Sequence, residues 1–509
     1  MEMKNMRLNL KQIFIIIFAA VLTFMLTACG AGDDENIGGS EQENVQNAGG
    51  GGYLEEPEIV ERMTVGFEPV DFGGYEFMFL TRTINDPDWA EWNHRDLTAE
   101  EITGEVINDA VFNRNRVIEE QFNITINETV LDHGVMGTRI RQAVNAGDEL
   151  FDAIGMHLMT FSGLAQEGMF VNLFDVPYLD LTKPWWDQGT VRDLSIMNKL
   201  FVTQGDLLVI DNDAMEAMIF NKRLLRDHNL ESPFEIVRRG EWTFRKLIEM
   251  SRGVARDLNG DGIMFIQDDL FGGITQADTS ISFLVSGGER IAGKDASDIP
   301  IITFGSERSF RIMDYVSEIM LDDQNFVQLH RYAGQFGIYD EQVRMMEEDR
   351  ALFSWIRMII VERLRGMETD FGLLPLPKLD EAQPNYITHM NPHTGVGIAI
   401  PITATDIART GMILEALSAE SRYTLRPAYY EISLRGRYVR DDESEEMLDI
   451  ILSNTAHDIG YVFNFGGFAM DIVHFGTNRR TEYASAFERA LVRMERDIER
   501  MIERFENLD

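Results

Sequence analysis

The chain has 509 residues, of which 46 are basic and 85 acidic, so its formal net charge is −39. A surface with this charge repels nucleic acid and anionic lipid, which argues against a nucleic-acid-binding role. Hydrophobic residues make up 44% of the chain, enough for a packed core, and the length predicts more than one domain or lobe.

The N-terminal segment has the parts of an export signal. An apolar run over residues 13–26 follows Lys4, Arg7 and Lys11 and ends just before Cys29, the single cysteine of the chain. The run is shorter than the roughly 20 residues that a membrane-spanning helix needs. Residues 26–29, LTAC, resemble the lipobox of bacterial lipoproteins, whose cysteine is acylated and becomes the mature N-terminus. The resemblance implies a signal peptide over residues 1–28 and a chain exported to the extracellular face of the cell membrane; an uncleaved anchor is the alternative.

The next segment, residues 29–70, is predicted to be a disordered tether. Its first part, residues 30–57, is rich in Gly, Glu, Asn and Gln and has almost no aromatic or branched apolar residues. A flexible chain of about 40 residues has an r.m.s. reach of roughly 35 Å. Such a tether holds a folded body clear of the membrane.

Beyond the tether, strand patterns alternate with helix patterns. The apolar spacing predicts strands at 76–81, 123–130 and 151–156, with helices at 100–121 and 137–146 between them. This alternation predicts a mostly parallel sheet with helices on both faces. Further helices are predicted at 243–255, 307–321, 404–419 and 482–505. The last carries an apolar stripe that is typical of a core-facing helix, formed by Phe487, Leu491, Met494, Ile498, Met501 and Phe505.

A loop in the middle of the chain has the spacing of a calcium-binding loop. Oxygen-bearing residues stand at positions 1, 3 and 5, a glycine follows, and a carboxylate closes the loop. The predicted ligands are Asp257, Asn259, Asp261, the carbonyl of Ile263, and Asp268, which Asp269 could replace. The sequence therefore predicts a structural Ca²⁺ site, with an Asx-rich surface turn as the alternative.

Seven short segments, in order, resemble the extracellular solute-binding proteins of family 1, the sugar receptors of ABC importers. They are AGDELFDA at 146–153, GMFVNL at 168–173, IFNKRLL at 219–225, EWT at 241–243, ALF at 351–353, FGLLPLP at 371–377 and GVGI at 395–398. The resemblance covers nearly the whole mature chain.

This resemblance implies an α/β fold that resembles the periplasmic binding proteins: a clamp of two lobes, each a mostly parallel sheet flanked by helices, joined by a multi-strand hinge. Residues 71–208 and 394–445 are assigned to lobe 1, and residues 209–393 and 446–509 to lobe 2. The hinge is expected near 205–211 and 392–395. A ligand that contacts both lobes would stabilise the closed clamp through its higher affinity for that state.

Sugars stack their C–H faces on aromatic rings and pair their hydroxyl groups with carboxylates and amides. On this basis and on the resemblance, the predicted ligand-binding residues are Trp355, Trp185, Trp186, Asp187, Asp211, Glu216, Asn464 and Phe465. Trp185 and Trp186 are adjacent, so in an extended strand only one of the two would face a given cleft.

The resulting hypothesis is a monomeric receptor, not an enzyme, that is anchored to the membrane by an N-terminal lipid. It captures a carbohydrate, an oligosaccharide in particular, and delivers it to the permease subunits of an ABC importer. Two alternatives stay open: a secreted glycan-active enzyme, which needs two carboxylates about 5 to 10 Å apart, and a ligand sensor or adhesin with the same clamp.

Overall fold

The computed structural model describes residues 62–85, 92–430 and 442–508. The predicted signal peptide, Cys29 and most of the tether lie outside these residues. No helix in the described ranges is both long and apolar enough to pass through a membrane.

The first sheet has the strand order β12-β3-β1-β2. Its strands are β1 (Tyr75–Thr83), β2 (Ile124–Asp132), β3 (Ala153–His157) and β12 (Val396–Ala399). β1 runs parallel to both β2 and β3, whereas β12 runs antiparallel to β3. The three strands predicted from the N-terminal alternation are thus confirmed, with β12 added from a distant part of the chain.

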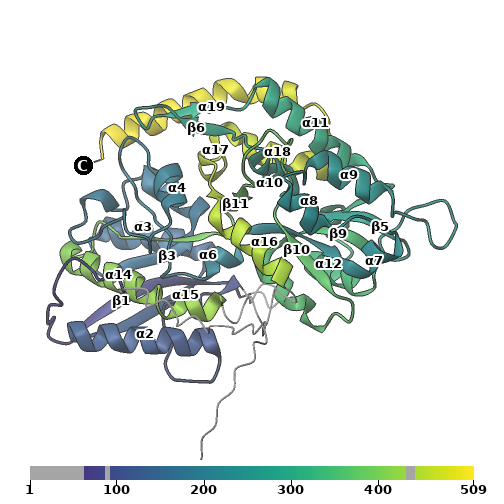
Figure 1. Ribbon diagram of the computed structural model, residues 1–509. Helices are drawn as coiled ribbons and strands as arrows, with labels where there is room; N and C mark the ends of the chain where they lie inside the picture. Colours follow the sequence, from purple (N-terminus) through teal and green to yellow (C-terminus); the bar gives the residue numbers. More distant parts are fainter. Residues whose placement is uncertain (1–61, 86–91, 431–441, 509) are drawn as a thin grey trace, which may run out of the picture. The chain divides into compact units, whose positions relative to one another are not determined.

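Helices cover both faces of this sheet, as the alternation predicts. α2 (Val106–Phe122) and α3 (His133–Ala146) cover opposite faces, as the usual right-handed crossover requires when β2 and β3 lie on opposite sides of β1. α2 packs with α14 (Ile407–Ser421) and α15 (Leu425–Ala428), and α4 (Leu158–Gln166) packs on β3 (Figure 1). α2 begins six residues later than predicted, because Gly104 has a φ of 85° and the Glu105 side chain caps the amide of Asn108.

The second sheet has the order β10-β4-β9-β5-β8. Its strands are β4 (Glu216–Asn221), β5 (Phe271–Thr275), β8 (Phe326–Gln328), β9 (Ala351–Arg357) and β10 (Phe371–Leu374). β5 runs parallel to β8 and β9, whereas β4 is antiparallel to β9 and to β10. The two sheets are therefore mixed, and each contains a parallel group of three strands.

Helices surround the second sheet, and several begin where its parallel strands end. They are α7 (Lys222–Asp227), α8 (Pro233–Arg238), α9 (Phe244–Arg252), α10 (Thr279–Ser286), α11 (Glu307–Leu321), α12 (Ile338–Glu347), α13 (Met358–Val361) and α16 (Asp442–Ser453). α11 has the predicted bounds, while α9 and α14 have bounds within three residues of the prediction.

The chain passes between the two sheets through short bridged segments. α5 (Gln188–Leu194) and α6 (Ile210–Asp213) precede β4, and single bridges join Thr203 to Ile398 and Met215 to Met390. Two small ladders, β6 (Ala292–Lys294) with β7 (Pro300–Ile302) and β11 (Thr388–His389) with β13 (Thr455–Ala456), complete the strands. The lobe ranges given above stay a prediction.

The C-terminal helices pack together and reach the first sheet's helices. α17 (Ile459–Val462) leads to α18 (Phe468–Thr477), and α19 (Tyr483–Glu506) contacts α18, β7 and α4. The buried stripe of α19 includes Met494, Ile498, Met501 and Phe505, which confirms most of the predicted apolar face. These methionines and aromatics are core residues.

Candidate functional site

The parallel strands of both sheets end at one cavity. β2 and β3 lead into His133 and His157, and the segment after β1 supplies Ile84. From the second sheet, Gln276 follows β5, while His330 follows β8 and Arg357 ends β9; Gln276, His330 and Arg357 line the same cavity, whose volume is about 560 Å³. Ligands of α/β proteins bind at the carboxyl ends of parallel strands, and here two such edges contribute to one site.

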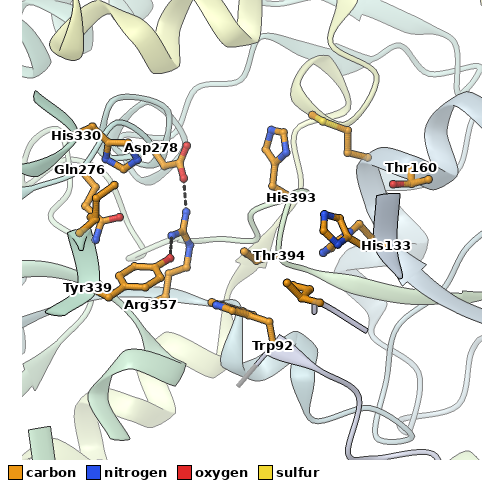
Figure 2. Close-up of a pocket in the computed structure, with 14 residues that line it drawn as sticks. Trp92, His133, Thr160, Gln276, Asp278, His330, Tyr339, Arg357, His393 and Thr394 are labelled. Atoms are coloured by element: carbon orange, nitrogen blue, oxygen red, sulfur yellow. Dashed lines mark hydrogen bonds and ion pairs between the residues drawn. The ribbon is translucent and has the colours of Figure 1, made fainter. Parts of the chain in front are cut away.

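Other elements complete the wall of the cavity (Figure 2). Helices α4, α10 and α12 contribute residues from their first turns or caps, and the segment between β11 and β12 contributes His393 and Thr394. The remaining lining residues are Trp92, Met159, Thr160, Asp278, Ile338 and Tyr339. The wall therefore combines a large aromatic ring, several imidazoles and an ion pair.

The ion pair joins Arg357 to Asp278. The Arg357 side chain is 5% exposed, and it donates through Nη2 to the Asp278 carboxylate and through Nη1 to the Tyr339 hydroxyl at 2.5 Å. Burial alone would raise the pKa of Asp278, but the charge of Arg357 and the nearby imidazoles hold it below its ordinary value. Asp278 is thus ionised at neutral pH, and Arg357 Nε has no hydrogen-bond partner within the described chain.

Four histidines line the cavity: His133, His157, His330 and His393. The backbone N–H of Ala277 points to Nδ1 of His330 at 3.1 Å, and because an amide can only donate, this ring carries its proton on Nε2. Burial lowers the pKa of His157 well below its usual value, and the charge of Arg82 lowers it further. Burial also lowers the pKa of His330, so both rings are neutral at pH 7. His157 can offer a donor and an acceptor, whereas His330, whose Nδ1 already accepts from Ala277, offers only its Nε2–H donor.

Trp92 supplies the large ring of the cavity. It is 1% exposed, and its indole Nε1 has no hydrogen-bond partner in the part of the chain described here. Figure 2 shows Trp92 between the side chains of Arg357 and His133. Since a buried indole N–H normally has a partner, this donor is available to a bound molecule.

The tryptophan and carboxylate residues predicted to bind ligand lie elsewhere. Trp355 is fully buried in β9, with its ring 5.1 Å from the Arg357 guanidinium. Trp185 and Trp186 are buried, and both donate to the Glu415 carboxylate, at 3.1 and 2.8 Å. Trp185 stands in a turn and Trp186 in a single β-bridge to Gly205, so the two do not form an extended strand and both indoles reach the same carboxylate.

Four of the predicted residues do meet, at a second cavity of about 240 Å³. Trp185, Trp186, Asp187 and Asp211 all belong to its lining. Asp187 caps α5, and burial raises the pKa of Asp211 well above its usual value. The structure therefore brings these four side chains together, and their role in binding stays a prediction.

Of the remaining predicted ligand residues, Glu216 and Phe465 are buried and Asn464 is partly exposed. Glu216 is fully buried and accepts hydrogen bonds from Ser282 and from Asn391, and it pairs with His389 at 2.9 Å. Asn464 has a φ of 47°, and Phe465 stacks on Phe463 at a centroid distance of 5.8 Å. Among the described residues that line the larger cavity, none belongs to the predicted set.

The loop predicted to bind calcium is held by its own backbone amides. Both carboxylate oxygens of Asp257 accept from the amides of Gly260 and Gly262, and Asn259 and Asp261 each accept from the residue two positions on. Buried Asp269, and not exposed Asp268, closes the loop through Leu258 and Phe265. Within the described ranges no group of three acidic, histidine or cysteine side chains is arranged to hold a metal ion. Calcium binding stays a prediction.

The position of two histidines at predicted strand ends could have indicated the cavity from the sequence, although a histidine by itself does not. The predicted strands at 123–130 and 151–156 end shortly before His133 and His157, and strand ends are where a parallel sheet presents a site. Arg357, Asp278 and Tyr339 gave no comparable signal, because Arg357 and Asp278 are 79 residues apart and meet only through the strand order.

Comparison with solved structures places the fold among ABC substrate-binding proteins. A Listeria monocytogenes substrate-binding protein in complex with cycloalternan is 10% identical, covers 86% of this chain and 100% of its own, and has a TM-score of 0.52. The maltodextrin-binding MalE domain of Bdellovibrio bacteriovorus, bound to maltotriose, is 13% identical with a TM-score of 0.52, and the alignment covers 83% of this chain and all of that one. UgpB from Mycobacterium tuberculosis, in complex with glycerophosphocholine, is 14% identical over 84% of this chain and 99% of its own, with a TM-score of 0.53.

No family model matches the sequence, and no curated protein matches it either. The structural likeness thus shows the fold, the two-lobe α/β architecture of periplasmic binding proteins, which confirms the fold class predicted from the sequence.

Proposed function

We propose that the protein is a family 1 extracellular solute-binding protein that captures a carbohydrate and delivers it to an ABC permease. The observation that carries this proposal is the cavity at the strand ends of both sheets. Its lining combines the Trp92 ring with neutral imidazoles and the Arg357–Asp278 pair, which are the groups that pack against sugar C–H faces and pair with hydroxyls.

The size and position of the cavity support an oligosaccharide ligand and a clamp mechanism. A volume of about 560 Å³ lies within the range of ligand sites, roughly 300 to 1,000 Å³. A ligand held by His157 of the first sheet and by Arg357 of the second would contact both, so its binding energy favours the state in which the two edges are close. That state is what a permease would recognise.

Binding is favoured over glycan hydrolysis by the carboxylates at the site. A glycosidase of the common type needs two carboxyl groups flanking the scissile bond. Asp278 is the single carboxylate among the described residues that line the cavity, and Arg357 already pairs with it. The Listeria monocytogenes and Bdellovibrio bacteriovorus proteins cited above, which share this fold, are a substrate-binding protein and a maltodextrin-binding domain.

Location at the extracellular face of the membrane is part of the same proposal. Cys29 would be acylated, and residues 29–70 would link it to the folded body. Mass spectrometry of the membrane fraction should show a diacylglyceryl-modified peptide that begins at Cys29, and Cys29→Ser should release the protein into the medium. An unmodified N-terminus in the membrane fraction contradicts the anchor.

The proposal is tested by a thermal-shift screen over mono- and oligosaccharides. A ligand that binds only the folded state raises the melting temperature, so one class of saccharide should stabilise the protein. Each hit should be incubated with the protein and analysed for cleavage, which separates a receptor from an enzyme. Loss of uptake of that saccharide in a deletion strain separates an importer receptor from a sensor or adhesin. No stabilisation by any saccharide contradicts the proposal.

A structural calcium ion in the loop 257–268 is a further part of the proposal. In the same assay calcium should raise the melting temperature of the wild-type chain, and Asp261→Ala should remove that increment. Magnesium serves as the control ion, since its stricter octahedral geometry does not suit such a loop. Equal responses of wild type and variant to calcium contradict the site.

A further inference from the structure

The cavity differs in charge from the rest of the protein. The whole chain carries a formal net charge of −39. The described residues that line the cavity, by contrast, include one carboxylate, Asp278, which is balanced by Arg357, and four histidines. The residues that line the cavity therefore carry no net negative charge, although the protein as a whole is strongly acidic.

Several helices begin at the cavity, so the positive ends of their dipoles meet there. α3 starts at His133, His157 caps α4, Asp278 caps α10, and Ile338 is the first residue of α12. The caps of α4, α10 and α12 make no side-chain hydrogen bond to their helices. Helix N-termini favour anions, because their amide groups and dipoles point toward the bound charge.

Buried donors without partners are the second, independent observation. Arg357 Nε and Trp92 Nε1 both belong to residues that line the cavity, are at most 5% exposed and have no hydrogen-bond partner in the described chain. Such donors are rare in folded proteins, because leaving them unpaired is costly. The two free N–H donors therefore indicate that a bound ligand supplies the hydrogen-bond acceptors.

Arg82 adds a buried positive charge that is close enough to His157 to lower the pKa of that ring, although Arg82 itself does not line the cavity. It lies in β1 two residues before Ile84, is 1% exposed, and none of its three guanidinium nitrogens has a hydrogen-bond partner among the described residues. Burial lowers the pKa of Arg82 to about 10, so the group stays charged at neutral pH. The nearby Asp96 carboxylate is committed to His94 and to the amides of Val209 and Ile210.

We propose that the ligand is an acidic saccharide, one that carries a carboxylate, sulfate or phosphate group, and that Arg357, Trp92 and the helix N-termini hold that group in the field of Arg82. This inference rests on the proposed function and specifies its substrate class. The neutral imidazoles and the Asp278 carboxylate bind the sugar hydroxyls, while the unpartnered donors take the anionic oxygens.

The test is calorimetric titration of the full chain with matched pairs of saccharides. Each pair shares its backbone and linkage but differs in charge, for example digalacturonate with galactobiose, glucuronate-containing with glucose-containing disaccharides, and sulfated with unsulfated chondroitin disaccharides. The acidic member of one pair should bind at least tenfold more tightly than its neutral partner. Raising the salt concentration should reduce this advantage.

The outcomes of this titration distinguish the proposal of an acidic ligand from the proposal of carbohydrate capture. If the binding saccharides are neutral, or bind as tightly as their acidic partners, the acidic class is wrong and carbohydrate capture stands. If no saccharide binds, both proposals fail, whether or not inorganic sulfate, phosphate or glycerophosphate binds. Binding of the free inorganic anions alongside an acidic saccharide would show which group is recognised.

Arg82→Met tests whether Arg82 contributes to the preference for an acidic saccharide. Arg82 is buried without a hydrogen-bond partner in the described chain, so a role in stabilising the fold does not explain it. Removing an unpaired buried charge should leave the melting temperature unchanged or higher, whereas the preference for the acidic member should fall at least tenfold. Arg141→Met is the control, because Arg141 pairs with Glu167 at the surface. An unchanged preference in Arg82→Met contradicts the role of Arg82; if this variant does not fold, the salt dependence of the wild-type preference decides the acidic class.

Discussion

Two clusters in this protein bury tryptophan beside charged groups, and they differ in whether their donors have partners. At the larger cavity, Trp92 Nε1 and Arg357 Nε have none among the described residues. In the other cluster, Trp185 and Trp186 both donate to Glu415. A cluster whose donors are satisfied stabilises the fold, whereas one with spare donors keeps capacity for a ligand. Hydrogen-bond satisfaction, more than residue type, distinguishes the two.

The greatest change that we expect is in the free energy of unfolding, which should depend on pH through Glu415 in the satisfied cluster. Burial raises the pKa of Glu415 from 4.5 to about 7, against the opposing hydrogen bonds of the two indoles. Between pH 7 and pH 4.5 the folded chain therefore binds more protons than the unfolded chain, and stability rises as the pH falls through this window. The shift corresponds to about 3 kcal/mol.

Glu415→Gln removes this titration and should cancel its contribution. The stability of the wild type minus that of the variant should rise by about 3 kcal/mol from pH 8 to pH 4.5, measured by urea unfolding at a series of pH values. Ligand affinity should stay within twofold. Parallel stability curves for the two proteins would show that Glu415 is ionised in the fold.

The second effect concerns the ion pair of the unsatisfied cluster. Arg357→Lys keeps the charge but loses the planar group that reaches Asp278 and Tyr339 together. Saccharide affinity should fall about 30-fold, which corresponds to about 2 kcal/mol for hydrogen bonds to charged groups. Titration calorimetry measures it, with Arg238→Lys, an exposed pair with Glu446, as the control. Equal affinities of Arg357→Lys and the control contradict the site.

How far the sequence predicts the molecule depends on whether a feature is local. The helix over 307–321 and the strands β1, β2 and β3 follow from apolar periodicity, which depends only on residues close together in the sequence. The cavity depends on strand order: β9 lies between β4 and β5, and this brings Arg357 to Asp278. The aromatic residues chosen by type, Trp355 among them, are buried by packing that periodicity does not reveal.

Replacing one tryptophan in each cluster by phenylalanine removes one indole N–H from each. The two substitutions should have opposite consequences for ligand affinity and stability. Trp92→Phe keeps a ring but removes the unpartnered donor, so affinity should fall about fivefold, or about 1 kcal/mol, with stability nearly unchanged. Trp186→Phe removes a hydrogen bond to Glu415 and should cost about 1 kcal/mol of stability, with affinity unchanged. If Trp186→Phe instead weakens binding, the smaller cavity is the ligand site.

The smallest change in the free energy of unfolding is expected for a surface ion pair outside both clusters, which serves as a reference. Arg141 and Glu167 form a pair at 2.6 Å with side chains 43% and 38% exposed. Arg141→Gln should change the free energy of unfolding by less than about 0.5 kcal/mol, because solvent screens such pairs. A loss as large as that expected for the buried groups would mean that burial is not what separates them from the surface.

A crystal structure of the protein with its tightest-binding saccharide would locate the ligand site itself. We expect the sugar to lie between the two sets of strand ends, within hydrogen-bonding distance of Arg357 Nε and Trp92 Nε1, and to contact His157 on the opposite wall. A sugar bound beside Trp185 and Trp186, with the larger cavity filled only by water, would contradict this expectation.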